Sequence, residues 1–235
     1  PEYAVIAHRG STFWTPEETE SAYRWAREIG ADYLECDMQV SKDGVVLALH
    51  DDNLKRTTNI ETVFGETLPR EIRKNYYMKI GYSETEAEEK VKADEANFVP
   101  NLPAYYTYEE LLMLDAGSWF NNENLEEALP GLAKEKQYIS TLEDLIMYSK
   151  GYRLIRDRNQ PGMPRQYSIV GKTGETITSL SGTADIVKYD FGYEIDPVWE
   201  AGNKNIPGIY IEFKEPWLNP KGFEQIVYDV LANTQ

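Results

Sequence analysis

The chain has 235 residues with 24 basic against 40 acidic side chains, and its 41% hydrophobic and 27% charged content is typical of a globular protein rather than a collagen-like, coiled-coil or disordered chain. Its net charge of −16 argues against nucleic acid or an anionic membrane surface as a partner, because both would repel it. The apolar runs fall well short of the ~18 residues of a membrane span, and the single cysteine, Cys36, excludes an internal disulfide framework.

The first forty residues predict a strand, a helix and a second strand. Residues 3–7 form a short apolar run typical of a buried strand. Thr15 is followed by a proline and then by Glu18 as a capping-box acid, so we expect a helix that is capped at Thr15 and closed by Gly30. Residues 32–40 predict the second strand. A strand–helix–strand unit with a crossover of this length favours a parallel sheet.

A third strand and a long polar segment follow. Residues 45–49 predict the strand, which comes directly after a Lys-Asp-Gly turn. Residues 59–106 are polar and turn-rich, and we interpret the acidic stretch 84–95 as a solvated helix face. Lys90 and Lys92 are expected to pair with nearby glutamates there. The acids of this stretch lack the spacing of a calcium-binding loop.

The rest of the chain predicts helices and one more strand. Residues 108–114 and 141–148 have helical patterns, residues 209–214 predict a fourth strand, and residues 223–231 predict a closing amphipathic helix.

Between these elements lies a second turn-rich region. Residues 167–170 and 176–180 predict a β-hairpin around Gly171-Lys-Thr-Gly174. Because this Gly-Lys-Thr lacks the spacing of a phosphate-binding P-loop, we interpret it as a turn.

Ionisable side chains gather at the carboxyl ends of the four predicted strands. They are His8 and Arg9 after the first strand, Glu35 and Asp37 in the second, His50 and Asp51 after the third, and Glu212 and Lys214 in the fourth. Alternate residues of a strand face the same way, so each pair two residues apart shares a face. This edge is where parallel α/β folds place their active sites.

The residue types limit the chemistry of this edge. Glu35, Asp37 and Glu212 form an all-oxygen set that suits a hard cation, Ca²⁺ or Mg²⁺. His8 and His50, the two histidines of the chain, can act as general base and general acid.

Two cationic residues complete the group. Arg9 and Lys214 can hold a phosphoryl group and stabilise its additional negative charge in the transition state. Taken singly, each residue has an ordinary structural interpretation; Glu17, for example, can be a helix N-terminal charge. The coincidence of all of them at one edge favours metal-dependent phosphodiester chemistry.

The chain resembles the glycerophosphodiester phosphodiesterases. The resemblance rests on motifs in the first 58 residues and on three later ones. They are His8-Arg-Gly, Pro16-Glu, Gly30-Ala-Asp, Glu35-Cys-Asp-Met-Gln39, Lys42-Asp-Gly44, His50-Asp51, Arg56-Thr-Thr58, Leu114-Asp-Ala-Gly-Ser-Trp-Phe120, Ser140-Thr-Leu-Glu143 and Tyr210-Ile-Glu-Phe-Lys214. The His-Arg-Gly signature distinguishes this family from the related spider-venom phospholipases D.

The resemblance implies an α/β fold, the TIM (β/α)₈ barrel of the phospholipase-C-like phosphodiesterases. Only 21 residues follow Lys214, so the chain is expected to carry the first half of such a barrel plus insertions. Because it starts at Pro1, it is expected to be a processed product or an excerpt of a longer protein. The implied divisions are barrel strands 1–3 in 1–58, a family insertion in 59–106, barrel helices in 107–150, a second insertion in 151–207, and a fourth barrel strand with its helix in 208–235.

The resemblance also implies roles for the residues of the edge. Glu35, Asp37 and Glu212 would be the metal ligands, His8 and His50 the catalytic acid–base pair, Arg9 and Lys214 the phosphate-binding residues, and Glu17 a support for the metal site. One departure is Glu18, where the family usually has asparagine.

The implied substrates are small glycerophosphodiesters such as glycerophosphocholine and glycerophosphoethanolamine, cleaved to sn-glycerol 3-phosphate and an alcohol. Two alternatives stay open: another lipid-headgroup phosphodiesterase of phospholipase C or D type, and an inactive barrel fragment that only binds. No stable membrane insertion is expected, and an extracytoplasmic location, periplasmic or secreted, is favoured over a cytoplasmic one.

Overall fold

The structure is a computed structural model that describes residues 3–129, 135–214, 219 and 222–234. Its strands are β1 (Ile6–Ala7), β2 (Tyr33–Val40), β3 (Val46–Ala48), β4 (Tyr152–Leu154), β5 (Tyr167–Ser179), β6 (Gly182–Phe191), β7 (Tyr193–Ile195) and β8 (Gly208–Phe213). Its helices are α1 (Glu20–Glu28), α2 (Ile60–Val63), α3 (Arg70–Lys79), α4 (Glu84–Ala96), the 3₁₀ helix η1 (Pro103–Tyr105), α5 (Tyr108–Leu111), α6 (Ser118–Glu123), α7 (Leu142–Ser149), α8 (Pro197–Ala201) and α9 (Phe223–Asn233).

The main sheet is built around β2. Strands β1 and β8 pair with β2 in parallel, which confirms the parallel sheet that the strand–helix–strand pattern predicts. Tyr33 lies between Ile6 and Gly208, while Met38 lies between Ala48 and Phe213. Strands β1 and β3 therefore follow one another along one edge of β2, and β8 occupies the other edge.

The third strand is not a parallel barrel strand, contrary to the expectation for residues 1–58. Strand β3 runs antiparallel to β2. The reason is the length of the connection: residues 41–45 form a tight turn in which the Gly44 N–H donates to the Ser41 carbonyl at 3.1 Å, whereas a parallel crossover needs about a dozen residues or more. The strand returns along β2, and the Leu49 N–H donates to the Asp37 carbonyl at 2.8 Å.

The first helix begins later than its sequence pattern predicts. Its N-cap is Thr19, whose hydroxyl accepts from the Ala22 N–H, and the predicted cap at Thr15 is wrong. The Thr15 hydroxyl donates instead to the Ser11 carbonyl at 2.6 Å. Glu18 has a φ of +56°, a left-handed conformation that a helix cannot contain, so it ends the preceding turn rather than forming a capping box.

The first strand is shorter and more exposed than expected. Only two residues of the apolar run pair with β2, and the side chains of Val5 and Ile6 are 62% and 47% exposed. The prediction of a buried strand was therefore wrong. On the opposite edge of β2, Tyr210 and Phe213 of β8 are also exposed, because in the described part of the chain β8 pairs with β2 alone.

The predicted hairpin between residues 167–170 and 176–180 is wrong, because both segments belong to one strand, β5, which forms a hairpin with β6 instead. Strand β5 continues through residues 171–174 and pairs with β6 up to Ser179 opposite Gly182. The turn expected at Gly171-Lys-Thr-Gly174 is instead a pair of register shifts within one long strand. Gly171 and Gly174 have φ values of +124° and +86°, which glycine adopts readily at bulges.

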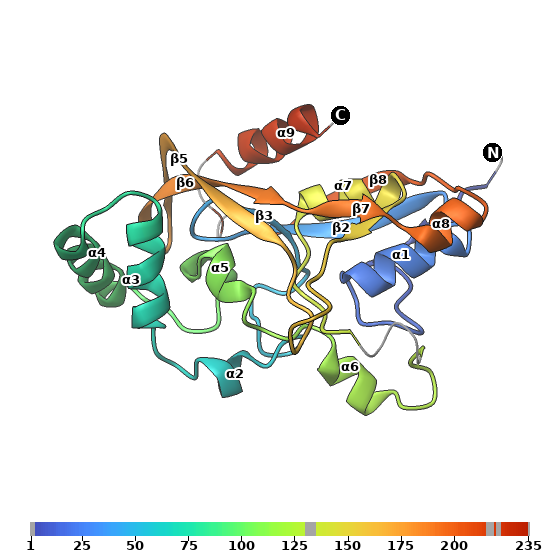
Figure 1. Ribbon diagram of the computed structural model, residues 1–235, viewed down its shortest axis with the longest axis horizontal. Helices are drawn as coiled ribbons and strands as arrows, with labels where there is room; N and C mark the ends of the chain where they lie inside the picture. Colours follow the sequence, from blue (N-terminus) through green and yellow to red (C-terminus); the bar gives the residue numbers. More distant parts are fainter. Residues whose placement is uncertain (1–2, 130–134, 215–218, 220–221, 235) are drawn as a thin grey trace.

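The helices surround the sheets from several sides. Figure 1 shows α3 and α4 packed together at one end of the molecule, α8 near the other end, and α9 on the opposite side of the sheets from α2 and α6. Helix α4 confirms the interpretation of the acidic stretch, and Ser83 and Glu86 form its capping box. The Lys90 ammonium, however, lies over the rings of Tyr77 and Tyr82 rather than against a glutamate.

The helical patterns of the second half are confirmed in part. Helix α7 is capped by Thr141 in a capping box with Asp144, and α9 follows the predicted closing segment. Helix α5 is shorter than its pattern, at four residues. The core joins β2, β3 and α7 through Leu34, Leu47 and Leu145. No helix among the described residues has both the length and the apolar character needed to cross a membrane.

Candidate active site

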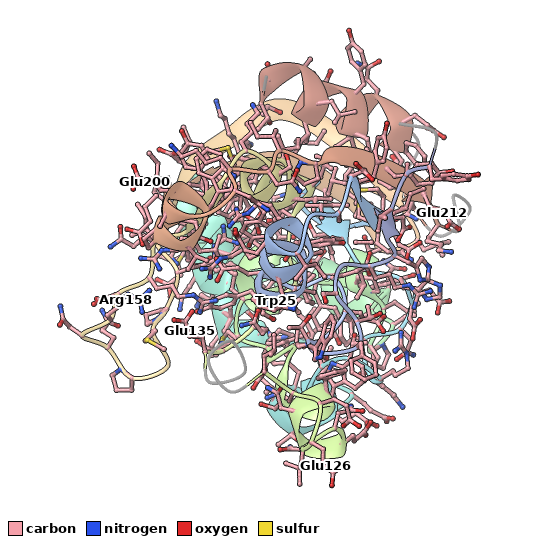
Figure 2. The ribbon with its side chains drawn as sticks, turned by 90° about the vertical axis from the view of Figure 1, so that its right-hand side faces the viewer. Trp25, Glu126, Glu135, Arg158, Glu200 and Glu212 are labelled. Carbon is pink, nitrogen blue, oxygen red and sulfur yellow. The ribbon has the colours of Figure 1, made fainter. Side chains whose placement is uncertain are left out.

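Three carboxylates meet where β2 and β8 lie side by side. Parallel pairing puts Asp37 directly opposite Glu212, and Glu35 shares the face of Asp37 two residues earlier. One oxygen of each of the three lies within 4.8 Å of the others. Glu35 and Asp37 are buried, and Glu212 is exposed. In Figure 2, Glu212 lies at one side of the molecule, opposite Glu200 and Arg158.

Arg9 approaches these carboxylates from the loop after β1. It adopts a left-handed φ of +58°, and its backbone N–H donates to Glu35 Oε2 at 2.8 Å. Its Nε lies 3.2 Å from Asp37 Oδ2. The loop is held tightly because Gly10, the next residue, packs its Cα against Ala22 of α1.

Lys214, directly after β8, approaches from the other side. Its ammonium lies 3.3 Å from Asp37 Oδ1 and also pairs with Glu212. This contact lowers the pKa of Glu212 and raises the pKa of Lys214, because each charge stabilises the other. Asp37, which is fully buried, therefore lies between two cations.

The carboxylate group fits a hard divalent cation. Within the described part of the chain, Glu35 Oε1 and both carboxylate oxygens of Asp37 are buried without a well-aligned hydrogen bond, and the contacts of Asp37 with Arg9 and Lys214 are ion pairs. Burial raises the pKa of Glu35, as expected for a carboxylate whose charge is not fully compensated. An all-oxygen set with free buried lone pairs is what Ca²⁺ or Mg²⁺ binds.

Both histidines lie close to the carboxylates. His50 and His8 lie near enough to Glu212 to contribute to its lowered pKa, after the contact with Lys214. Because β3 runs back along β2, it brings Leu49, the residue before His50, against Asp37 even though the strand is antiparallel. The Nδ1 atom of His50 lies 2.6 Å from Asp51 Oδ1. Since an ionised carboxylate only accepts hydrogen bonds, this contact places a proton on Nδ1, so that in the neutral imidazole Nε2 is the nitrogen without a proton.

Glu17 lies beside the cations rather than within the carboxylate group. Its carboxylate is 3.4 Å from Arg9 Nη1 and accepts two hydrogen bonds from Arg56. Arg56 also donates to Asp51. This contact, followed by the one with His50, lowers the pKa of Asp51 to about 2. Salt bridges and hydrogen bonds thus join seven of the eight candidate residues, His50 through Asp51 and Arg56, while His8 lies near enough to Glu35 and Glu212 to influence their pKa values.

Three further residues contribute to this region without having been assigned a role. Asp51 is grouped with the strand-end residues in the sequence but given no role, and Arg56 is only part of a motif. Their signal in the sequence is the placement of a carboxylate directly after a strand-end histidine. The third is Glu18, which is 3% exposed and accepts the Asp37 N–H at 2.7 Å through Oε1. Burial, followed by the charge of Asp37, raises the pKa of Glu18 well above its usual range.

The sequence matches one protein-family model. The glycerophosphoryl diester phosphodiesterase family model matches residues 8–168, more than half of the chain. Glu212 and Lys214 lie beyond that match, and it is the pairing of β8 with β2 that brings them to Asp37.

Curated relatives agree with the family model. The chain is 29% identical over 142 residues to a glycerophosphodiester phosphodiesterase of Bacillus subtilis, which covers 60% of this chain and 34% of that protein. It is 27% identical over 190 residues to a putative glycerophosphodiester phosphodiesterase, YhdW, of the same species, covering 80% and 57%. A phosphodiesterase of Oleispira antarctica, solved with the product sn-glycerol-3-phosphate, is 26% identical with a TM-score of 0.38, covering 63% of this chain and 42% of that one.

The chain thus spans between a third and about three fifths of these two curated relatives. The matched segment nevertheless holds both histidines and two of the three carboxylates. The chain belongs to the glycerophosphoryl diester phosphodiesterase family.

Proposed function

We propose that the chain carries the active site of a metal-dependent glycerophosphodiester phosphodiesterase. The observation that supports this most directly is the approach of one oxygen each of Glu35, Asp37 and Glu212 to within 4.8 Å of one another. Arg9 and Lys214 flank these carboxylates. Family membership makes hydrolysis of a phosphodiester the reaction that such a site would serve.

The roles follow from the residue types and their positions. Glu35, Asp37 and Glu212 would hold Ca²⁺ or Mg²⁺, which, when bound, supplies positive charge to the phosphoryl oxygens. Arg9 and Lys214 would bind the non-bridging oxygens and stabilise the charge that develops on them.

The histidines would move the protons. One histidine, His50 through its free Nε2 in our assignment, takes the proton of the glycerol 2-hydroxyl as that oxygen bonds to phosphorus. The bond from phosphorus to the alcohol oxygen breaks, and His8 gives that oxygen a proton. In the second step the roles reverse: His8 takes a proton from water as the water oxygen bonds to phosphorus, the bond from phosphorus to the glycerol 2-oxygen breaks, and His50 returns a proton to that oxygen to give sn-glycerol 3-phosphate.

The rest of the fold is part of the same proposal. Strands β1, β2 and β8 would be neighbouring strands of a (β/α)₈ barrel, with the carboxylates at the carboxyl ends of the strands, where barrel enzymes place their chemistry. The exposed apolar side chains of β1 and β8 support this, since both strands leave an edge unpaired in the described part of the chain.

The test is release of glycerol 3-phosphate from glycerophosphocholine with Ca²⁺, Mg²⁺ or EDTA. We expect EDTA to abolish release and Glu212→Gln to lower kcat by about 10²–10³-fold, because loss of one ligand weakens both metal binding and charge stabilisation. Glu200→Gln is the matched control, since it removes an exposed carboxylate on the opposite side of the molecule.

A binding measurement separates the metal site from turnover. At a metal concentration of 100 times the Kd, binding stabilises the fold by about 2.7 kcal/mol, which thermal unfolding detects, and Glu212→Gln should reduce that shift. Release that is unaffected by EDTA would contradict the metal-dependent mechanism. A metal-induced shift without any release would instead favour a binding module that lacks turnover.

A further inference from the structure

The loop after β3 joins the two ends of the site through one arginine. We propose that Arg56 is a positioning residue that holds His50 and Arg9 in a fixed mutual arrangement through Asp51 and Glu17. The inference rests on the proposed function, because it concerns how the acid–base histidine is placed relative to a phosphate-binding residue.

The guanidinium of Arg56 contacts both carboxylates in bidentate fashion. Its Nε lies 2.6 Å from Asp51 Oδ2, and its Nη2 lies 3.1 Å from Asp51 Oδ1. On the other side, Nη1 lies 3.0 Å from Glu17 Oε2, and Nη2 lies 2.7 Å from Glu17 Oε1. Only a planar guanidinium can donate to two carboxylates in this geometry, whereas a lysine ammonium offers one point of charge.

Each of the two carboxylates contacts and orients a different residue of the site. Asp51 uses Oδ1 to contact Nδ1 of His50 at 2.6 Å, which selects the tautomer whose Nε2 is free. Glu17 uses Oε1 to contact Nη1 of Arg9 at 3.4 Å. Arg9 in turn contacts Asp37. A continuous series of charged contacts therefore runs from the histidine to the buried carboxylate.

The fold determines where Arg56 lies. Leu54, two residues before it, is fully buried and its N–H donates to the Asn101 carbonyl at 2.8 Å. The hydroxyl of Thr58 donates to the Leu54 carbonyl, which closes the turn on the other side. The ring of Trp119, in α6, lies 5.8 Å from the guanidinium carbon. The arginine is therefore held by three separate segments, as expected of a residue that positions others.

The chain offers a matched control one residue away. Lys55 has the same side-chain exposure as Arg56, 44%, but it pairs with Glu61, which is outside the site. The experiment compares Arg56→Gln, Arg56→Lys and Lys55→Gln. Nitrogen NMR of the imidazoles reports the tautomer directly, and the chain has only two histidines to assign. The His8→Gln variant identifies the signals of His50.

We expect Arg56→Gln to shift the neutral His50 imidazole away from the Nδ1–H tautomer and to lower kcat by about 10–100-fold, as for other residues that orient a catalytic group. Arg56→Lys should retain only part of the activity, because lysine keeps the positive charge but not the planar set of N–H donors that contacts both carboxylates. Lys55→Gln should stay within about twofold of wild type. Asp51→Asn should lower kcat as well, and its combination with Arg56→Gln should cost less than the sum, because both act on His50.

Two results would overturn the inference. One is an unchanged tautomer and unchanged kcat in Arg56→Gln; the other is full additivity of the two substitutions. If Arg56→Gln fails to fold, as judged by circular dichroism, Arg56→Lys decides by the same two measurements. A wild-type chain that is inactive with every metal would count against the proposed function, while the tautomer comparison would still test the role of Arg56.

Discussion

Asp37 is the side chain of the candidate site whose burial costs the most free energy. It is fully buried, and among the residues that the structure describes its carboxylate oxygens have no well-aligned hydrogen bond and its charge is opposed by ion pairs with Arg9 and Lys214. Burying such a charge costs several kcal/mol before any compensation. A cluster of this kind is therefore poor as a stabilising device, and its location at a sheet edge is typical of a functional site.

Glu143 shows how a carboxylate away from the site responds to burial. It lies in the first turn of α7 and lines a cavity of about 1040 Å³ together with residues of β5, β6 and α9. Burial, followed by the neighbouring charge of Asp144, raises its pKa to about 7. The folded state therefore holds this proton more tightly than the unfolded chain does.

Glu143 is predicted to make stability fall as the pH rises. Because the pKa is higher in the folded state, its favourable contribution is complete below about pH 4.5 and is lost by about pH 7. Allowing for solvent screening, we expect a loss of roughly 1 kcal/mol over this range. Urea unfolding at pH 5 and pH 7 measures it, and Glu143→Gln should lose that part of the pH dependence. Identical pH profiles for the two proteins would contradict the shift.

At the scale of elements, the placement of His8 and Arg9 depends on how closely their loop approaches α1. A Cβ at Gly10, whose φ is +88°, would lie 2.7 Å from the Cβ of Ala22. Gly174, in the β5 bulge, has nearly the same φ, +86°, and a Cβ there would meet nothing within 4 Å. Alanine substitutions at the two glycines therefore distinguish the free-energy cost of backbone strain from the cost of a steric clash.

Gly10→Ala is predicted to be much more destabilising than Gly174→Ala. Both substitutions pay about 1–2 kcal/mol for an alanine in a left-handed conformation. Gly10→Ala adds a clash that must push α1 and the His8 loop apart, typically about 1–3 kcal/mol. Chemical denaturation gives both free energies of unfolding, and equal losses would show that the loop can move without cost.

At the scale of the whole molecule, a buried ion-pair group joins the helical end to the rest of the chain. Arg73 of α3 is fully buried; it contacts Glu110 of α5 at 2.8 Å and Asp94 of α4 at 2.7 Å. It also donates to the Tyr105 carbonyl of η1 at 2.8 Å. One guanidinium thus connects four separate helices.

Replacing Arg73 by leucine should destabilise the fold by about 3–5 kcal/mol, because it leaves the fully buried Glu110 carboxylate without its ion-pair partner. Arg70→Leu is the control on the same helix, since Arg70 makes its ion pairs with Glu88 and Glu95 at the surface. We expect that variant to remain close to wild type. Comparable urea midpoints for the two variants would refute the idea that burial decides the difference.

The sequence by itself predicted most residues of the candidate site. Strand-end chemistry and family motifs were enough to select Glu35, Asp37, Glu212, His8 and His50, because such information is local. The helices α4 and α7 were equally predictable from their caps. Local pattern could not, however, determine that β3 turns back, since both directions bury the same apolar residues and only the short 41–45 connection excludes a crossover.

Only the tertiary structure decided how these residues are connected. Glu18 resembled a helix cap in the sequence, yet it holds the Asp37 backbone. In the sequence Arg56 was only one residue of a motif, yet in the structure its side chain joins Asp51 to Glu17. Contacts of this kind depend on which segments meet in space. The chemical types of a site can thus be predicted from the sequence, whereas its hydrogen-bond partners are determined by long-range packing.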